Sequence, residues 1–160
     1  MDEIHKLLNE LNINYEEISH KKLYTIEDAI NENIESKING MECKNLFVKN
    51  KNNYYLIFIE ALKKVNLKDL KKIVNENNLR FASEEELKSI LSLDIGSVTP
   101  LGIINDKDNK VTLLISESLK DKKVLVHPLD NSKTMSLEFS DLIRIIEYLN
   151  HKYIYFNNCD

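Results

Sequence analysis

The chain has 160 residues, of which 42% are hydrophobic and 30% are charged, and its formal net charge at pH 7 is −4. This length suits a core-forming domain, and no Ser-, Gly- or Pro-rich linker divides the sequence, so we expect a single domain over residues 1–160. The acidic balance argues against a protein that grips long duplexes through many phosphates, and DNA is not an expected partner. No apolar run approaches the roughly 20 residues of a membrane span, and the N-terminus lacks a signal-peptide pattern, so we expect a cytoplasmic protein without membrane contact.

Short helices and strands follow one another along the chain without a strict βαβ order. The predicted helices cover residues 1–12, 25–32, 66–76, 83–91 and 141–150. The predicted strands cover residues 14–20, 43–49, 54–60, 101–104, 111–115, 124–126, 134–139 and 153–156. This mixture favours an α+β or α/β fold built on a mixed sheet.

Several of these elements carry end signals or clear burial patterns. Thr25 and Ser83 are expected helix N-caps, Ser83 in a capping box with Glu86, and Ser140 is expected to cap the last helix. Residues 54–59 are nearly all apolar, so that strand is expected to be buried on both faces. The helix over 66–76 is predicted to turn four apolar residues inward: Leu67, Leu70, Ile73 and Val74.

Strong catalytic or cofactor motifs are absent from the sequence. It has no GxSxG nucleophile elbow, no HExxH, no Walker loop and no GxGxxG. The two cysteines, Cys43 and Cys159, show neither metal-ligand nor CxxC spacing, so we interpret them as incidental thiols. No metal and no organic cofactor is expected.

Three local features could carry chemistry, and each has a plainer interpretation. Lys44, followed by Asn45, lies among apolar strand residues, where it could attract a phosphate or carbonyl oxygen or protect a sheet edge from aggregation. The loop 96–100 holds a glycine and a proline; it could present backbone N–H groups to an oxyanion or ribose, or form a simple turn. His127, held by Pro128 at a strand end, could meet a ligand or be bonded to the backbone.

A run of lysines lies on one face of the helix predicted over residues 66–76 and just before it. Such a face could steer RNA phosphates, or it could be solvated helix surface. The residues are Lys64, Lys68, Lys71 and Lys72.

Five segments, in order, are shared with one known family. They are 24–29 (YTIEDA), 44–47 (KNLF), 81–87 (FASEEEL), 96–102 (GSVTPLG) with 104–106 (IND), and 127–129 (HPL) with Asn131. Through them nearly the whole chain resembles the YbaK/prolyl-tRNA-deacylase family of aminoacyl-tRNA editing domains. The KNLF and HP elements favour the free-standing alanyl-tRNA(Pro) deacylase (PrdX-like) branch. The resemblance implies a mixed, barrel-like β-sheet surrounded by helices.

The resemblance also implies an activity, partners and a site. The activity is trans-editing, in which the aminoacyl ester of mischarged tRNA is hydrolysed, with Ala-tRNA(Pro) as the substrate. The partners are the acceptor end of tRNA(Pro) and, optionally, prolyl-tRNA synthetase. Two alternatives stay open: a deacylase for cysteine or serine, and a non-catalytic module that binds tRNA ends or a synthetase. The implied catalytic residues are Lys44, Gly96, Ser97, Val98 and Thr99. The implied substrate-binding residues are Thr25, Asn45, Pro100, His127 and Asn131.

Hydrolysis of an aminoacyl ester suits a chain without a strong nucleophile. The ester is activated by its neighbouring ammonium and hydroxyl groups, so a protein need only orient it, place a water and stabilise the oxyanion. A missing methylene changes binding only modestly, so alanine escapes a synthetase pocket built for proline. We therefore expect a small apolar pocket that admits alanine and excludes proline.

Overall fold

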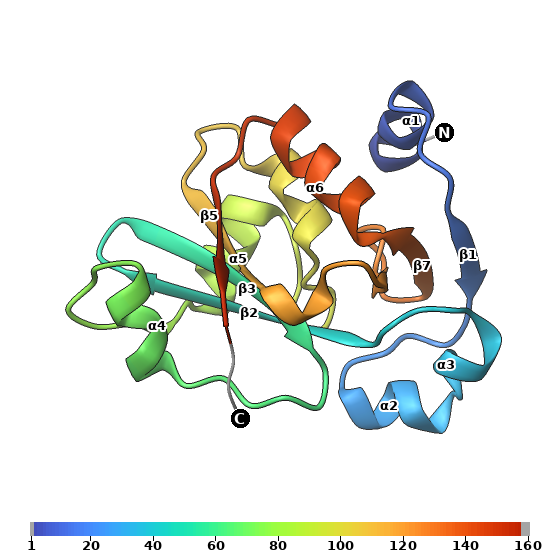
Figure 1. The fold of residues 1–160 in the computed structure, drawn as a ribbon, viewed down its shortest axis with the longest axis horizontal. Helices are drawn as coiled ribbons and strands as arrows, with labels where there is room; N and C mark the ends of the chain where they lie inside the picture. The colour runs from blue at the N-terminus through green and yellow to red at the C-terminus, as the bar shows by residue number, and fades with distance from the viewer. Residues whose placement is uncertain (1, 158–160) are drawn as a thin grey trace.

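The protein is described by a computed structural model that covers residues 2–157, in which helices surround two β-sheets (Figure 1). The three-stranded sheet is antiparallel and has the order β1–β7–β6. Its strands are β1 (Glu16–Ser19), β6 (Lys123–Val126) and β7 (Lys133–Glu138). The five-stranded sheet has the order β4–β2–β3–β5–β8. Its strands are β2 (Cys43–Asn50), β3 (Asn53–Glu60), β4 (Arg80–Phe81), β5 (Val111–Ser116) and β8 (Tyr153–Phe156).

The five-stranded sheet is mixed, as the sequence predicts. Strands β3, β5 and β8 run parallel, whereas β2 is antiparallel to both of its neighbours. The two sheets meet just before β2, where Met41 pairs with Val124 in a parallel bridge. The Met41 amide donates to the Lys123 carbonyl at 2.8 Å, and the Leu125 amide donates to the Met41 carbonyl at 3.0 Å. The expected barrel-like sheet is thus two sheets joined at one corner, in a mixed α/β domain.

The helices cap and cover these sheets. They are α1 (Glu3–Glu10), α2 (Ile26–Asn31), α3 (Ile34–Lys37), α4 (Leu67–Ile73), α5 (Glu84–Leu91) and α6 (Phe139–Tyr148), with 3-10 turns η1 (Pro100–Asn105) and η2 (Glu117–Leu119). Thr25 and Ser83 are the N-caps of α2 and α5, as predicted, and the predicted capping box of Ser83 with Glu86 is present; Thr25 forms a second capping box with Asp28. None of the described helices has the length and apolarity that a bilayer crossing requires.

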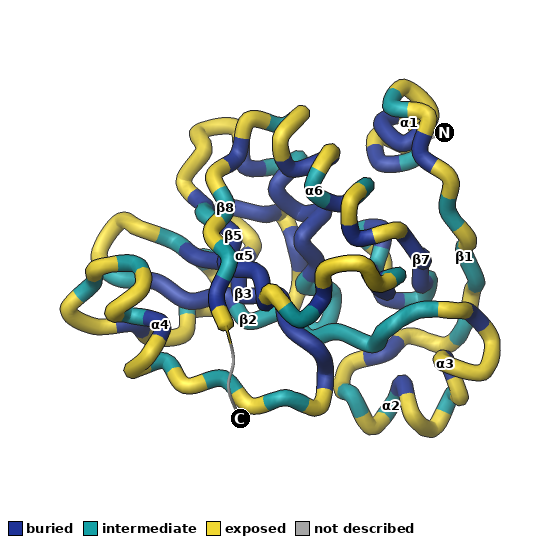
Figure 2. Tube along the Cα trace, in the orientation of Figure 1, coloured by how far each residue is buried: buried dark blue, intermediate teal, exposed yellow. Residues whose placement is uncertain are grey.

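Strand β3 lies at the centre of the core (Figure 2). Leu56 and Phe58 belong to the main core between the sheets, while Ile57 and Ile59 pack on the other face with Leu70 of α4. The strand is therefore buried on both faces, as its continuous apolar run predicts.

Three sequence predictions were wrong in detail. Residues 101–104 form part of η1 rather than a strand: Pro100 fixes φ at its first position, and Thr99 Oγ1 accepts from the Leu101 amide at 3.3 Å. A short apolar run does not distinguish a buried strand from a buried helical turn. Helix α6 begins at Phe139, so Ser140 lies inside it and does not cap it. Ile73, the last residue of α4, is 43% exposed rather than turned inward.

Other elements were not predicted at all. Helix α3, strand β4 and turn η2 each have four residues or fewer, too short for a periodic pattern. Cys159, interpreted as an incidental thiol, lies outside the described residues.

Candidate active site

A cavity of about 210 Å³ opens where the segment leading into α2, the start of β2, the loop after α5 and the end of β6 meet. Its apolar lining comes mainly from Leu23, Ile26, Ala29, Leu125 and Val126. Six of the ten predicted site residues also line it: Thr25, Lys44, Asn45, Gly96, Val98 and His127. The cavity is small, as expected, but its wall is mixed rather than purely apolar.

The other four predicted residues lie around this cavity without lining it. Ser97 and Asn131 line a neighbouring cavity of about 530 Å³, which shares the exposed Tyr24 with the first. Thr99 and Pro100 are buried at the start of η1. These two residues hold the end of the loop, so their contribution to a site would be indirect.

The loop 96–100 begins at a position that favours glycine. Gly96 has φ +94°, a conformation that side-chain-bearing residues rarely adopt, and a Cβ placed there would lie 2.7 Å from the Tyr24 ring. The Ser97 amide already donates to the Asp94 carbonyl at 3.0 Å. Among the described residues no acceptor is found for the amides of Gly96 and Val98, so these two remain available to a ligand.

Strand β2 brings Lys44 and Asn45 to the cavity, both half-buried. Successive side chains of a strand point to opposite faces of the sheet. Because the cavity lies at the end of the strand, it contacts both side chains. Strand β4 pairs with β2 only at Val48 and Lys49, so in this sheet Lys44 is paired on one side alone, with Ile59. The Asn45 Oδ1 atom is buried and finds no hydrogen-bond partner among the described residues. Such an orphaned acceptor is costly unless a ligand or water satisfies it.

His127 is held in one orientation by the backbone. Its Nδ1 lies 2.8 Å from the Lys133 carbonyl, which only accepts, so Nδ1 carries the proton. Burial lowers the pKa of His127 below its usual value, and the ring of His20, whose centroid is 6.4 Å away, acts in the same direction. The ring is therefore neutral at pH 7, and its Nε2 is a hydrogen-bond acceptor.

The structure adds Tyr24, Glu42 and Thr134 to the cavity wall. Burial and repulsion from Glu35 raise the pKa of Glu42 to about 7. No sequence pattern points to this residue, because a glutamate just before a strand is ordinarily solvated surface. Its environment comes from helices α2 and α3, which are packed beside it.

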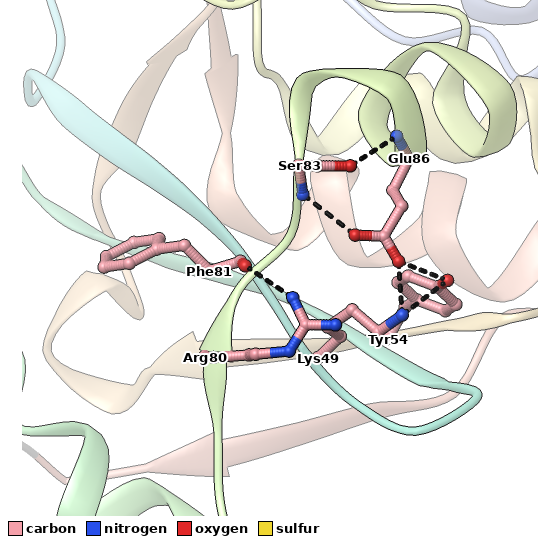
Figure 3. A network of polar contacts seen from close by, with 6 residues as sticks. All are labelled: Lys49, Tyr54, Arg80, Phe81, Ser83 and Glu86. Carbon is pink, nitrogen blue, oxygen red and sulfur yellow. Dashed lines mark hydrogen bonds and ion pairs between the residues drawn. The ribbon is translucent and has the colours of Figure 1, made fainter.

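A polar cluster fixes helix α5, from which the loop 96–100 follows (Figure 3). The Lys49 ammonium group is hydrogen-bonded to Glu86 and lies 3.2 Å from the Tyr54 hydroxyl, which itself donates to Glu86 at 3.0 Å. The other Glu86 oxygen accepts from the Ser83 amide at 2.9 Å. The cluster thereby ties the start of α5 to the β2–β3 hairpin.

The lysines on and before α4 do not face the cavity. Figure 1 places α4 at the opposite end of the molecule from α2 and α3, which flank the cavity. Within residues 2–157 no group of three His, Cys, Asp or Glu side chains could hold a metal ion.

A family model for the aminoacyl-tRNA editing domain matches residues 20–145, which contain every residue of this cavity. The chain belongs to the aminoacyl-tRNA editing domain family. The prolyl-tRNA editing protein ProX of Acetoanaerobium sticklandii is 36% identical over 143 residues, covering 88% of this chain and 86% of that protein. The mouse prolyl-tRNA synthetase associated domain-containing protein 1 is 33% identical over 161 residues, covering 97% of this chain and 94% of that protein.

Solved structures share the fold at low sequence identity. The hypothetical protein APE2540 matches with a TM-score of 0.73 and 14% identity over 95% of this chain and 97% of that one. A candidate trans-editing enzyme for prolyl-tRNA synthetase matches with a TM-score of 0.72 and 14% identity over 99% of both chains. At this identity the likeness establishes the fold alone.

Proposed function

We propose that this chain removes alanine from mischarged tRNA(Pro) by hydrolysing the aminoacyl ester. The observation that carries the proposal is the convergence of Thr25, Lys44, Asn45, Gly96 and His127, from four separate segments, on one small cavity. Membership of the editing-domain family supports hydrolysis of an aminoacyl-tRNA, and the name of the ProX relative supports a prolyl-tRNA substrate.

The free polar groups at this cavity match what ester hydrolysis needs. Within residues 2–157 no acceptor is found for the amides of Gly96 and Val98, and Lys44 adds a positive charge. Donors held in a partly dry site stabilise the negative charge that develops on the carbonyl oxygen. Asn45 Oδ1 and His127 Nε2 are acceptors, suited to hold a water or a ribose hydroxyl.

The proposed reaction needs no covalent enzyme intermediate. A water bound at His127 Nε2 attacks the ester carbonyl carbon, and its proton passes to Nε2 as the new C–O bond forms. The Gly96 and Val98 amides, with Lys44, stabilise the tetrahedral oxyanion. When this intermediate collapses, the bond to the ribose oxygen breaks and that oxygen takes the proton from Nε2. The products are free alanine and tRNA with its terminal hydroxyl restored.

Cavity size would provide the choice between amino acids. The side chain enters a space bounded by the apolar wall of Leu23, Ala29 and Val126, within a total volume of about 210 Å³. Alanine presents one methyl group there, whereas proline presents a ring closed onto its nitrogen. Extra atoms forced against a packed wall are destabilising, whereas a smaller side chain leaves the wall unstrained. We therefore expect the alanyl ester to be hydrolysed at least about 10-fold faster than the prolyl ester.

The test is a deacylation assay on one tRNA(Pro) charged in turn with alanine, proline, cysteine and serine. The expected result is rapid release of alanine while the prolyl ester decays at its spontaneous rate. Faster release of cysteine or serine than of alanine would assign the site to that amino acid instead. Binding of every charged tRNA without acceleration of any would show a non-catalytic module.

A further inference from the structure

Glu42 stands in the wall between two cavities. It lines the candidate active site and also a second cavity of about 170 Å³ on the far side of α2. Ile26 and Ala29 complete this shared wall, and Leu62 and Glu35 close the second cavity. Because the surroundings are largely apolar, the Glu42 carboxyl group has lost much of its hydration.

No protein group compensates this carboxyl group. Among the described residues no hydrogen bond or ion pair to its oxygens is found; only its backbone carbonyl is engaged, by the Ala61 amide at 2.9 Å. The nearby Glu60 shows the contrast, since it accepts from Ser118 at 2.6 Å and pairs with Lys63 and Lys122. A carboxylate buried for stability alone would be paired in the same way.

The charges near Glu42 favour a cationic ligand. Glu35 on α3 adds a second negative charge at the second cavity, and Cys43, the next residue, is a thiol whose pKa burial raises. Lys44 is the cation of this segment and lines the same cavity, but no ion pair between it and Glu42 is found among the described residues. An ammonium group entering the cavity would therefore meet a carboxyl group for which no ion-pair partner is found among the described residues, and its positive charge would favour the ionised form of that carboxyl group.

We infer that Glu42 binds the α-ammonium group of the aminoacyl ester and so selects substrates whose amino group is free. The inference rests on the proposed function and assigns a specificity residue within it. Every aminoacyl-tRNA carries this ammonium next to the scissile carbonyl, so a carboxylate in the same cavity as the Gly96 amides orients the ester from its other side. Asn45, whose buried Oδ1 finds no hydrogen-bond partner among the described residues, lines the same cavity and offers a second polar group beside the carboxyl group.

The experiment pairs a change in the protein with a change in the substrate. Wild-type protein, E42Q, E42D and E35Q are each assayed on alanyl-tRNA(Pro) and on lactyl-tRNA(Pro), in which a hydroxyl replaces the amino group. Each value of kcat/KM is divided by the spontaneous hydrolysis rate of the same ester, which removes the intrinsic lability of the alanyl ester. Thermal melting of every variant checks folding. E35Q removes a charge outside the active-site cavity together with its repulsion of Glu42, so it should not lower the normalised kcat/KM for the alanyl ester.

The expected result is a loss of deacylation activity on the alanyl ester and not on the lactyl ester. E42Q should lower the normalised kcat/KM for alanyl-tRNA(Pro) by about 10- to 100-fold, the range for a hydrogen bond to a charged group. The lactyl ester should change by less than about twofold, because it has no charge to lose. E42D keeps the charge and should show a smaller loss, again on the alanyl ester alone.

The remaining outcomes separate the two proposals. Equal loss on both esters, or no loss on either, would overturn the role of Glu42 while leaving deacylation intact. If E42Q does not fold, the same comparison in E42D decides, since an equal effect on both esters would again overturn the role. Wild-type protein that accelerates neither ester would overturn the proposed function and this inference with it.

Discussion

Strand β2 carries one lysine near each end, and their surroundings differ sharply. Lys49 is buried, bonded to Glu86 and Tyr54, and lies over the Tyr54 ring with its Nζ 4.8 Å from the ring centroid. Near Lys44, in contrast, the Asn45 amide oxygen, the Glu42 carboxyl group and the Gly96 amide all lack partners among the described residues. Polar groups that serve the fold are satisfied within it, whereas the groups at the cavity are left free for something that binds.

The largest expected effect comes from G96A. The added methyl group would meet the Tyr24 ring, and the positive φ would be strained, so the loop should shift and its free amides should leave their positions. We expect kcat/KM for alanyl-tRNA(Pro) to fall by about 100-fold or more, as when an oxyanion donor is lost. I95A, at an exposed residue next to the loop that does not line the cavity, is the control and should stay near wild-type activity. A fully active G96A would exclude the loop from the reaction.

The paired variants K44M and K49M test the contrast between the two lysines directly. K44M should lower kcat/KM by about 10- to 100-fold with little change in melting temperature, because it removes a charge from the site and not from an ion pair. K49M should leave kcat/KM unchanged and lower the melting temperature by about 2–4 °C, because Glu86 loses its cation. Stability and steady-state kinetics measured on the same preparations check both. If K49M lowered kcat/KM and K44M lowered the melting temperature, the assignment of Lys44 to the reaction and of Lys49 to stability would be wrong.

The pH dependence of the reaction sharpens the role of His127. Its lowered pKa keeps Nε2 unprotonated above the ordinary histidine value of 6.5, so the acceptor is fully present at pH 7 and is lost as the pH falls through the lowered pKa. With lactyl-tRNA(Pro), which carries no ammonium group, kcat/KM should stay level from pH 7 to 8 and decline only below about pH 6.5. In H127N the plateau should be lower and the decline absent. A decline that persists in H127N would belong to another group.

The smallest effect concerns acid stability at the paired end of β2. Lys49 holds the pKa of Glu86 down to about 2, well below its usual 4.5. A lowered carboxyl pKa stabilises the fold above the unfolded value, and this contribution is lost as the pH falls from about 4.5 toward 2. E86Q should therefore melt a few degrees below wild type at pH 7, and the difference should shrink between pH 5 and 3. A difference independent of pH would assign the effect to packing instead.

Most of the fold could be predicted because its signals are local. The N-cap at Thr25, the capping box at Ser83 and the apolar run over residues 54–59 each depend on neighbours within a few positions, and the structure confirms them. Residues 101–104 were predicted as a strand, but an apolar run suits a buried 3-10 turn equally well. Their packing position between α5 and the sheets, which no local pattern reveals, decides between the two. The family resemblance supplied the candidate site residues, whose roles remain predictions.

The sequence by itself determined the mixed α/β class, the main helices and strands, and the membership of an editing-domain family, because periodicity, caps and motifs lie within short stretches of chain. Only the tertiary structure decided which polar groups are left unpaired. Lys44 and Lys49 are five residues apart on one strand, yet Glu86 binds Lys49 from 37 positions away, and in the described part of the chain no such partner is found for Lys44. The same holds for Glu42, whose lost hydration is imposed by helices that the chain brings beside it only when it folds.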